Sequence, residues 1–197
     1  MSTRYFRLSD DVYIPGRWEL GAPTDPRGRE IDDPWQFADG KPVSIEGRLK
    51  LPIKRPGKPL DFSLAGIGVT PIVHARVASL LAELAPSDVQ LIPVEIDSQT
   101  DPYCILVATH RIRCIDDKAS EEVEYWMPED EQPEKVGEYR NVAGMRIDPT
   151  RVGNTRLFRT WGWPIALVVS DEIKAAIEHA GITGTRFRDV TGPAQVP

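Results

Sequence analysis

Prolines and glycines interrupt the first sixty residues so often that this part of the chain cannot form a long helix. They include Pro15, Gly16, Gly21, Pro23, Pro26, Gly28, Pro34, Gly40, Pro52, Pro56, Gly57 and Pro59. Proline fixes the backbone angle φ and lacks an N–H donor, and glycine favours turns. Short apolar segments such as 5–8 and 49–53 lie between these residues. The pattern therefore predicts a β-rich, irregular N-terminal part over residues 1–60.

The first of two helical patterns covers residues 71–85. Pro71 suits a first helical turn, and Pro86 marks the end of the helix. Apolar residues follow the spacing of three and four that places side chains on one helix face. They are Ile72, Val73, Val77, Leu80, Leu81 and Leu84.

The second helical pattern covers residues 171–180. Ser170 is a suitable N-cap, two acids in the first turn complement the helix dipole, and Gly181 is a suitable stop. Strand-length apolar segments precede and follow both helices. We therefore predict an α+β fold, with a mainly antiparallel sheet and two principal helices.

The region after residue 60 contains two similar helix–strand units. Shifting the chain by 96 residues (158 − 62) overlays 62–94 on 158–190 without a gap and with four identical residues. The similarity could reflect a true repeat or only the periodicity that any two such units share. We expect a β-rich subdomain at 1–60 and an α+β domain at 61–197, packed together as one compact unit.

Charge and hydropathy exclude several classes of protein. The 197 residues include 24 Lys and Arg and 30 Asp and Glu, a formal net charge of −6, which disfavours direct nucleic-acid binding by the whole chain. No apolar run approaches the ~20 residues of a membrane helix, and the N-terminus lacks the apolar centre of a secretory signal. We therefore expect a cytoplasmic protein that does not bind membranes.

The sequence contains no recognisable catalytic or metal-binding motif. None of the three histidines has a partner at metal-ligand spacing, and no Gly-x-Ser-x-Gly motif occurs. Cys104 and Cys114 fit free thiols, although a hairpin near Thr109 could pair them. We expect no metal, no cofactor and no enzymatic activity. The alternative is a small hydrolase or transferase with a dispersed site, using the basic residues of 41–58 with His110 or Cys104.

Negative charge is concentrated in residues 116–138. This segment holds ten acids and two lysines, a local charge of −8, so the remainder of the chain sums to +2. Its middle contains Tyr125, Trp126 and Met127. Apolar anchors among carboxylates are typical of protein-binding surfaces, because the anchors supply buried area and the acids attract a basic partner. The other interpretation is a solvated loop whose aromatic residues pack into the core.

We select partner contacts from this acidic segment, with Trp126 as the anchor. The segment contains two prolines, which favours an irregular and exposed conformation. The candidate contacts are Glu121, Glu122, Glu124, Trp126, Glu129, Asp130 and Glu131.

The order of motifs along the chain resembles family eleven of the immunity proteins of bacterial polymorphic-toxin systems, once a domain of unknown function. The stretch Val169-Ser170-Asp171-Glu172-Ile173-Lys174 is the most specific part of the resemblance, which covers nearly the whole chain. The other parts are Asp61-Phe62, Pro71-Ile72-Val73, the strand at 89–94, the segment 103–116 with Ser120, Leu157-Phe158-Arg159, and 180–184 with Phe187.

The resemblance implies a cytosolic protein that binds and neutralises a cognate toxin, often a nuclease in such systems. It supplies no catalytic residues. From the charge distribution we expect the toxin to present a basic surface to the acidic segment. A structural component of a larger assembly is a third class of function, which exposed apolar surface for self-association would favour.

Overall fold

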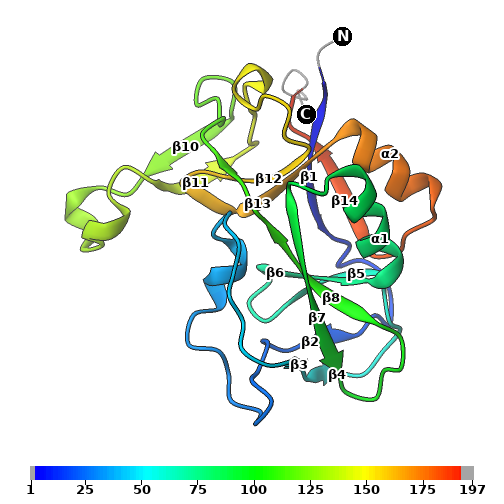
Figure 1. Cartoon of the computed structure of the whole chain (residues 1–197). Coiled ribbons are helices and arrows are strands. Elements are labelled where there is room, and N and C mark those ends of the chain that lie inside the picture. Colours follow the sequence, from blue (N-terminus) through cyan, green and yellow to red (C-terminus); the bar gives the residue numbers. More distant parts are fainter. Residues whose placement is uncertain (1–2, 192–197) are drawn as a thin grey trace.

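The computed structural model describes residues 3–191, which form two five-stranded sheets, two α-helices and a projecting hairpin (Figure 1). The first sheet has the order β3-β7-β8-β6-β5 and the second the order β14-β1-β13-β12-β9. The first contains β3 (Leu49–Leu51), β5 (Phe62–Ala65), β6 (Thr70–His74), β7 (Val89–Ile96) and β8 (Tyr103–Ala108). The second contains β1 (Tyr5–Asp10), β9 (Arg111–Ile112), β12 (Leu157–Thr160), β13 (Trp163–Ser170) and β14 (Thr185–Asp189).

Most strand pairs in both sheets are antiparallel. The two parallel pairs within them, β3 with β7 and β9 with β12, each lie at one edge of a sheet. With the helices α1 (Ala75–Leu84) and α2 (Asp171–His179), this confirms the predicted α+β class. Within residues 3–191 no helix combines the length and the apolar composition needed to cross a membrane.

The two sheets share one arrangement of four strands. The β5–β6 hairpin leads directly into α1 and then β7, as the β12–β13 hairpin leads directly into α2 and then β14. In space the order is β5-β6-β8-β7 in one sheet and β12-β13-β1-β14 in the other, with every neighbouring pair antiparallel. The third strand in this order is β8 in the first sheet and the N-terminal strand β1 in the second sheet. The two helices contact each other on one side of the molecule (Figure 1).

The first helix begins later than its periodicity predicts. The sequence pattern places the helix start at Pro71, but Thr70–His74 is strand β6 and α1 begins at Ala75. Ile72 and Val73 are both fully buried, on opposite faces of the sheet, where they pair with β8. β-Branched residues favour such positions. His74 then caps the helix, because its Nδ1 accepts the Arg76 N–H at 3.1 Å.

The second helix matches its sequence signals. Ser170 Oγ accepts the N–H of Ile173 at 3.4 Å, which makes it the N-cap. Gly181 follows the helix with φ of +62°, a left-handed conformation that glycine adopts without strain. Ile173 and Ile177 form the buried face.

Buried apolar side chains pack on both faces of both sheets. One core cluster fills the space between the sheets and beneath the helices. A second lies on the far side of the second sheet, under residues 112–152, and a third lies on the far side of the first sheet, under residues 18–51. Residues 1–60 contribute β1 to the second sheet and β3 to the first, while β2 (Glu19–Leu20) pairs with β4 (Ile53–Arg55). The division into 1–60 and 61–197 stays a prediction.

Both cysteines are free thiols in the described structure. Cys104 is half-buried, and Cys114 is fully buried in the second core cluster. Burial raises the pKa of both thiols, that of Cys114 to about 12. Both therefore stay protonated near neutral pH, which makes them poor nucleophiles.

Alkaline pH is expected to destabilise the fold through Cys114. In the unfolded chain the Cys114 thiol ionises at its ordinary pKa near ~8.5, whereas in the folded chain its pKa is about 12. The folded state therefore retains a proton that the unfolded state loses, so the free energy of unfolding falls as pH rises between these values, by about 3 kcal/mol at pH ~11. Guanidinium unfolding of the wild type and of Cys114→Ala at several alkaline pH values measures this contribution. A parallel decline in the two proteins would contradict it.

Candidate functional site

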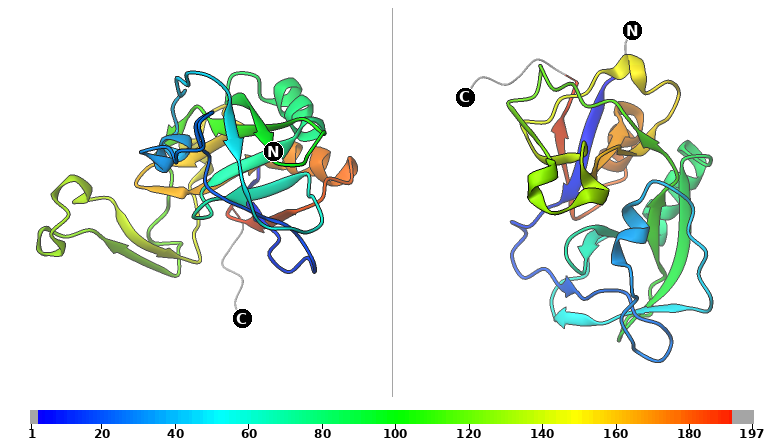
Figure 2. Two further views of the ribbon diagram at one scale, coloured as in Figure 1. Left: turned by 90° about the horizontal axis from the view of Figure 1, so that it is seen from below. Right: turned by 90° about the vertical axis from the view of Figure 1, so that its left-hand side faces the viewer.

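The acidic segment forms a hairpin that projects from the body of the protein, here called the arm (residues 122–143). Strand β10 (Glu122–Tyr125) pairs antiparallel with β11 (Tyr139–Ala143). The connecting loop contains two 3-10 turns, η2 (Pro128–Asp130) and η3 (Pro133–Lys135), each beginning with a proline. Figure 2 shows that the arm extends well beyond the two sheets, with the loop at its far end.

Exposed and half-buried side chains alternate along β10, so one face of this strand points to the body of the protein and the other to solvent. Val123 and Tyr125 are half-buried and pack against the second core cluster, whereas Glu122 and Glu124 are exposed. Adjacent strand residues point to opposite faces, so the two glutamates share the solvent side. Backbone hydrogen bonds between the two sides of the hairpin continue beyond the strands, since the Trp126 N–H donates to the Glu138 carbonyl at 2.9 Å.

Two tyrosines and one carboxylate hold the arm at the point where its strands meet the loop. The rings of Tyr125 and Tyr139 stack with their centroids 4.9 Å apart. Both hydroxyls donate to the carboxylate of Asp117, that of Tyr139 at 2.8 Å. Burial, followed by the bond to Asp117, raises the pKa of Tyr139. The Asp117 carboxylate therefore fixes the arm to the segment that precedes it.

The arm carries seven acids and two bases, a net charge of −5 (2 − 7). Of these acids five are exposed and two are half-buried. The bases are Lys135 and Arg140, and the acids are Glu122, Glu124, Glu129, Asp130, Glu131, Glu134 and Glu138.

The structure places the six predicted contact acids in three settings. Glu122, Glu124, Glu129 and Glu131 are exposed on the arm. Asp130 is half-buried and has partners within the arm: its carboxylate accepts the Met127 N–H at 2.8 Å and pairs with Arg140 at 3.0 Å. Glu121 precedes the arm, with its side chain beside Gly144.

Trp126 lies between the loop and the strands rather than in the core. It is half-buried, with the Lys135 ammonium 5.1 Å and the Arg140 guanidinium 5.6 Å from its ring centroid. These cation–π contacts hold the indole in place. The loop also exposes Met127 (54%) and Val136 (44%), so its end is partly apolar. Our contact prediction omitted both residues, although Met127 directly follows Trp126 and Val136 stands between Lys135 and Gly137 in the sequence.

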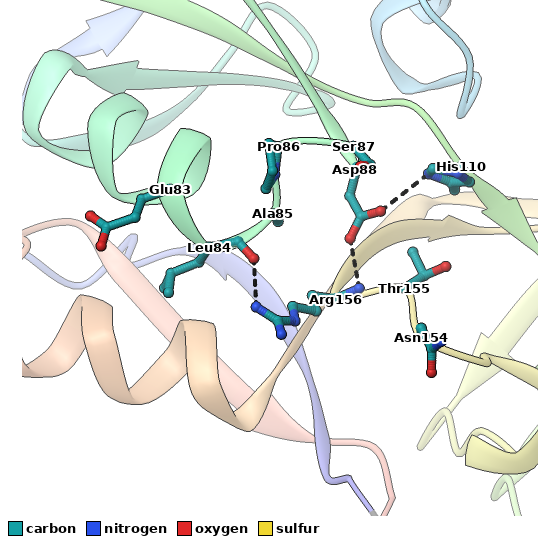
Figure 3. A pocket seen from close by; sticks show the side chains of 10 residues that line it. All are labelled: Glu83, Leu84, Ala85, Pro86, Ser87, Asp88, His110, Asn154, Thr155 and Arg156. Carbon is teal, nitrogen blue, oxygen red and sulfur yellow. Dashed lines mark hydrogen bonds and ion pairs between the residues drawn. The ribbon is translucent and has the colours of Figure 1, made fainter.

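A separate hollow of about 450 Å³ lies where α1 ends, and Figure 3 shows its lining. The Asp88 carboxylate accepts the Arg156 N–H at 2.7 Å and lies 3.5 Å from His110 Nδ1. The Arg156 guanidinium donates to the Leu84 carbonyl at 2.7 Å. These contacts join the start of β7 to the segment before β12, and therefore link the two sheets.

The elements of the enzymatic alternative lie apart. Cys104 does not line the hollow that contains His110, and none of the basic residues of 41–58 reaches it. Three of those basic residues pair with acids elsewhere, for example Arg48 with Glu95 at 3.2 Å. Among residues 3–191, no group of three or more histidine, cysteine or acidic side chains could hold a metal ion.

A comparison with protein families places most of the chain in a known family. The family described as "Immunity protein family (Imm11)" matches residues 17–192, which is most of the chain and includes the entire arm. No curated protein matches the sequence.

Proposed function

The chain belongs to the Imm11 immunity protein family, and from this premise we propose that it binds a cognate bacterial toxin in the cytoplasm through the arm and neutralises it. The observation that carries the proposal is the projecting hairpin with a net charge of −5 and apolar residues at its end. In a protein whose family function is immunity, an exposed extension of this kind suits insertion into a toxin.

The toxin surface that fits the arm is basic and concave. Such a surface binds the polyanionic substrate of a nuclease, so a nuclease is the class of toxin that we propose. The arm would occupy that cleft and block the substrate by steric exclusion and by charge competition. The shape of the arm supports this, because its loop extends beyond the sheets and can enter a cleft that the body cannot (Figure 2).

Charge and apolar contacts have different effects on binding. Exposed carboxylates accelerate association with a basic partner and suppress binding to acidic proteins, but contribute little affinity at a solvated rim. Affinity comes from a few desolvated anchors. Trp126, Met127 and Val136 supply such anchors at the end of the arm.

Reversing the charge of three exposed acids on the arm is expected to slow association with the toxin. The triple variant Glu124→Lys, Glu129→Lys and Glu131→Lys removes acids that make no ion pair within residues 3–191. We expect the association rate to fall by about tenfold or more at low salt, and its salt dependence to flatten. Surface plasmon resonance at several salt concentrations measures both effects.

The matched control reverses three exposed acids outside the arm, Asp32, Glu46 and Asp97. Both triple variants change the net charge by the same amount. Equal effects from the two would show that overall charge, and not the arm, governs association. Neutralisation itself is tested by growth of bacteria that produce the toxin encoded beside this gene, with and without the chain. Absence of protection would contradict the proposed function.

A further inference from the structure

The outer face of the second sheet carries arginines that the proposed function does not use. On β14, Arg186 and Arg188 are exposed, while Phe187 between them packs into the core beneath the helices. Side chains alternate along a strand, so the two arginines point away from α2. β14 is the edge strand of its sheet, which leaves this face accessible at the margin of the molecule.

Two of the arginines stand directly opposite each other in the sheet. Arg7 on β1 is the register partner of Arg188 on β14. Like charges at such positions lie close together and destabilise a sheet. Neither guanidinium makes an ion pair with a carboxylate within residues 3–191. Burial, and then the charge of Arg188, lowers the pKa of Arg7.

A third arginine approaches the same place from another segment. Arg146 is only 9% exposed, and one of its Nη atoms donates to the Asp189 carbonyl at 3.0 Å. Its Nε is buried and has no hydrogen-bond partner among residues 3–191. A buried donor without a partner is uncommon in a native structure and costs free energy. An anion beside Arg146 would accept a hydrogen bond from this Nε–H group.

Three of these arginines, but not Arg7, border a hollow of about 530 Å³. Arg146, Arg186 and Arg188 line it, together with the acids Glu121 and Asp189. The Asp189 carboxylate is engaged by Arg4 and by Thr191. Among the described residues that line the hollow, Glu121 is the other carboxylate, so three guanidinium groups and two carboxylates leave a positive balance.

We propose that this hollow binds a phosphate group, either as inorganic phosphate or as a small phosphate monoester. Guanidinium groups match tetrahedral oxyanions because each offers several N–H donors in a fixed fork. Three guanidinium groups around one hollow would bind several phosphate oxygens at once. One of their donors, the Arg146 Nε–H, is already desolvated and, among residues 3–191, unpaired. The site is distinct from the arm and does not depend on the proposed toxin binding.

The test measures thermal stability and binding with inorganic phosphate and with glycerol phosphate, each against sodium chloride at matched ionic strength. We expect both ligands to raise the Tm of the wild type, since a ligand that binds only the folded state stabilises it. A similar shift for both ligands identifies the phosphate group alone as the determinant. A larger shift for glycerol phosphate identifies a monoester as the preferred ligand. No shift beyond that of sodium chloride with either ligand would overturn the proposal.

Three variants separate binding from a structural role. Arg188→Gln is expected to weaken phosphate affinity at least about tenfold and to raise the Tm of the ligand-free protein, because it relieves the repulsion with Arg7. Glu121→Gln is expected to strengthen affinity, because it removes the opposing carboxylate. Arg27→Gln, an exposed arginine elsewhere, is the control for net charge. Unchanged phosphate affinity in Arg188→Gln would overturn the site even if the wild type binds.

Discussion

Replacing Trp126 with alanine is expected to weaken toxin binding by at least about 30-fold, which corresponds to about 2 kcal/mol. The indole is half-buried in the free protein, held between Lys135 and Arg140. Its removal both deletes apolar contact area and releases two cations that it positions. The dissociation constant from isothermal titration calorimetry measures the effect, which we expect mainly in the dissociation rate.

The matched control is Trp35→Ala. Trp35 is also a partly exposed tryptophan (41%), but it lies on η1 (Pro34–Ala38), outside the arm. We expect this variant to bind the toxin as the wild type does. Wild-type affinity in Trp126→Ala, or an equal loss in both variants, would contradict the assignment of Trp126 as the anchor.

Replacing Asp117 with alanine is expected to lower the free energy of unfolding by roughly 2–3 kcal/mol. The carboxylate accepts hydrogen bonds from Tyr125 and Tyr139, and the Tyr139 side chain is buried. Without Asp117, both hydroxyls lose their acceptor, and that of Tyr139 lies at a part-buried position. Chemical unfolding measures the loss, and a weaker toxin affinity should accompany it because the arm loses its attachment.

A double-mutant cycle provides the control for Asp117. Each single variant removes the same hydrogen bond, so Asp117→Ala combined with Tyr139→Phe should be more stable than the sum of the single losses predicts. Strict additivity would show that Asp117 and Tyr139 act independently. Such a result would contradict the account of how the arm is held.

Local sequence signals predicted those elements whose determinants lie close together in the chain. The cap at Ser170, the buried face of Ile173 and Ile177, and the stop at Gly181 all lie within twelve residues (170–181) and specify α2. The start of α1 was predicted wrongly because Ile72 and Val73 fit a helical spacing equally well. Their pairing with β8, more than thirty residues away, decided in favour of a strand.

The charge of the site was predictable, but its shape was not. The sequence shows the acids and the neighbouring aromatic residues, whereas the hairpin depends on pairing across the loop, with a bulge next to Tyr125. The same loop brings Arg140 to Asp130, so the Asp130 carboxylate forms its ion pair within the arm. The cluster of arginines on the second sheet was not predicted, because β1, β14 and the segment at Arg146 are far apart in the sequence.

Amide hydrogen exchange of the chain alone and bound to its cognate toxin would show whether the arm is the binding surface. We expect the toxin to slow exchange in residues 122–143, with little change in the turn at 66–69 between β5 and β6. Slower exchange confined to other surfaces, with the arm exchanging as in the free protein, would contradict the claim that the arm binds the toxin.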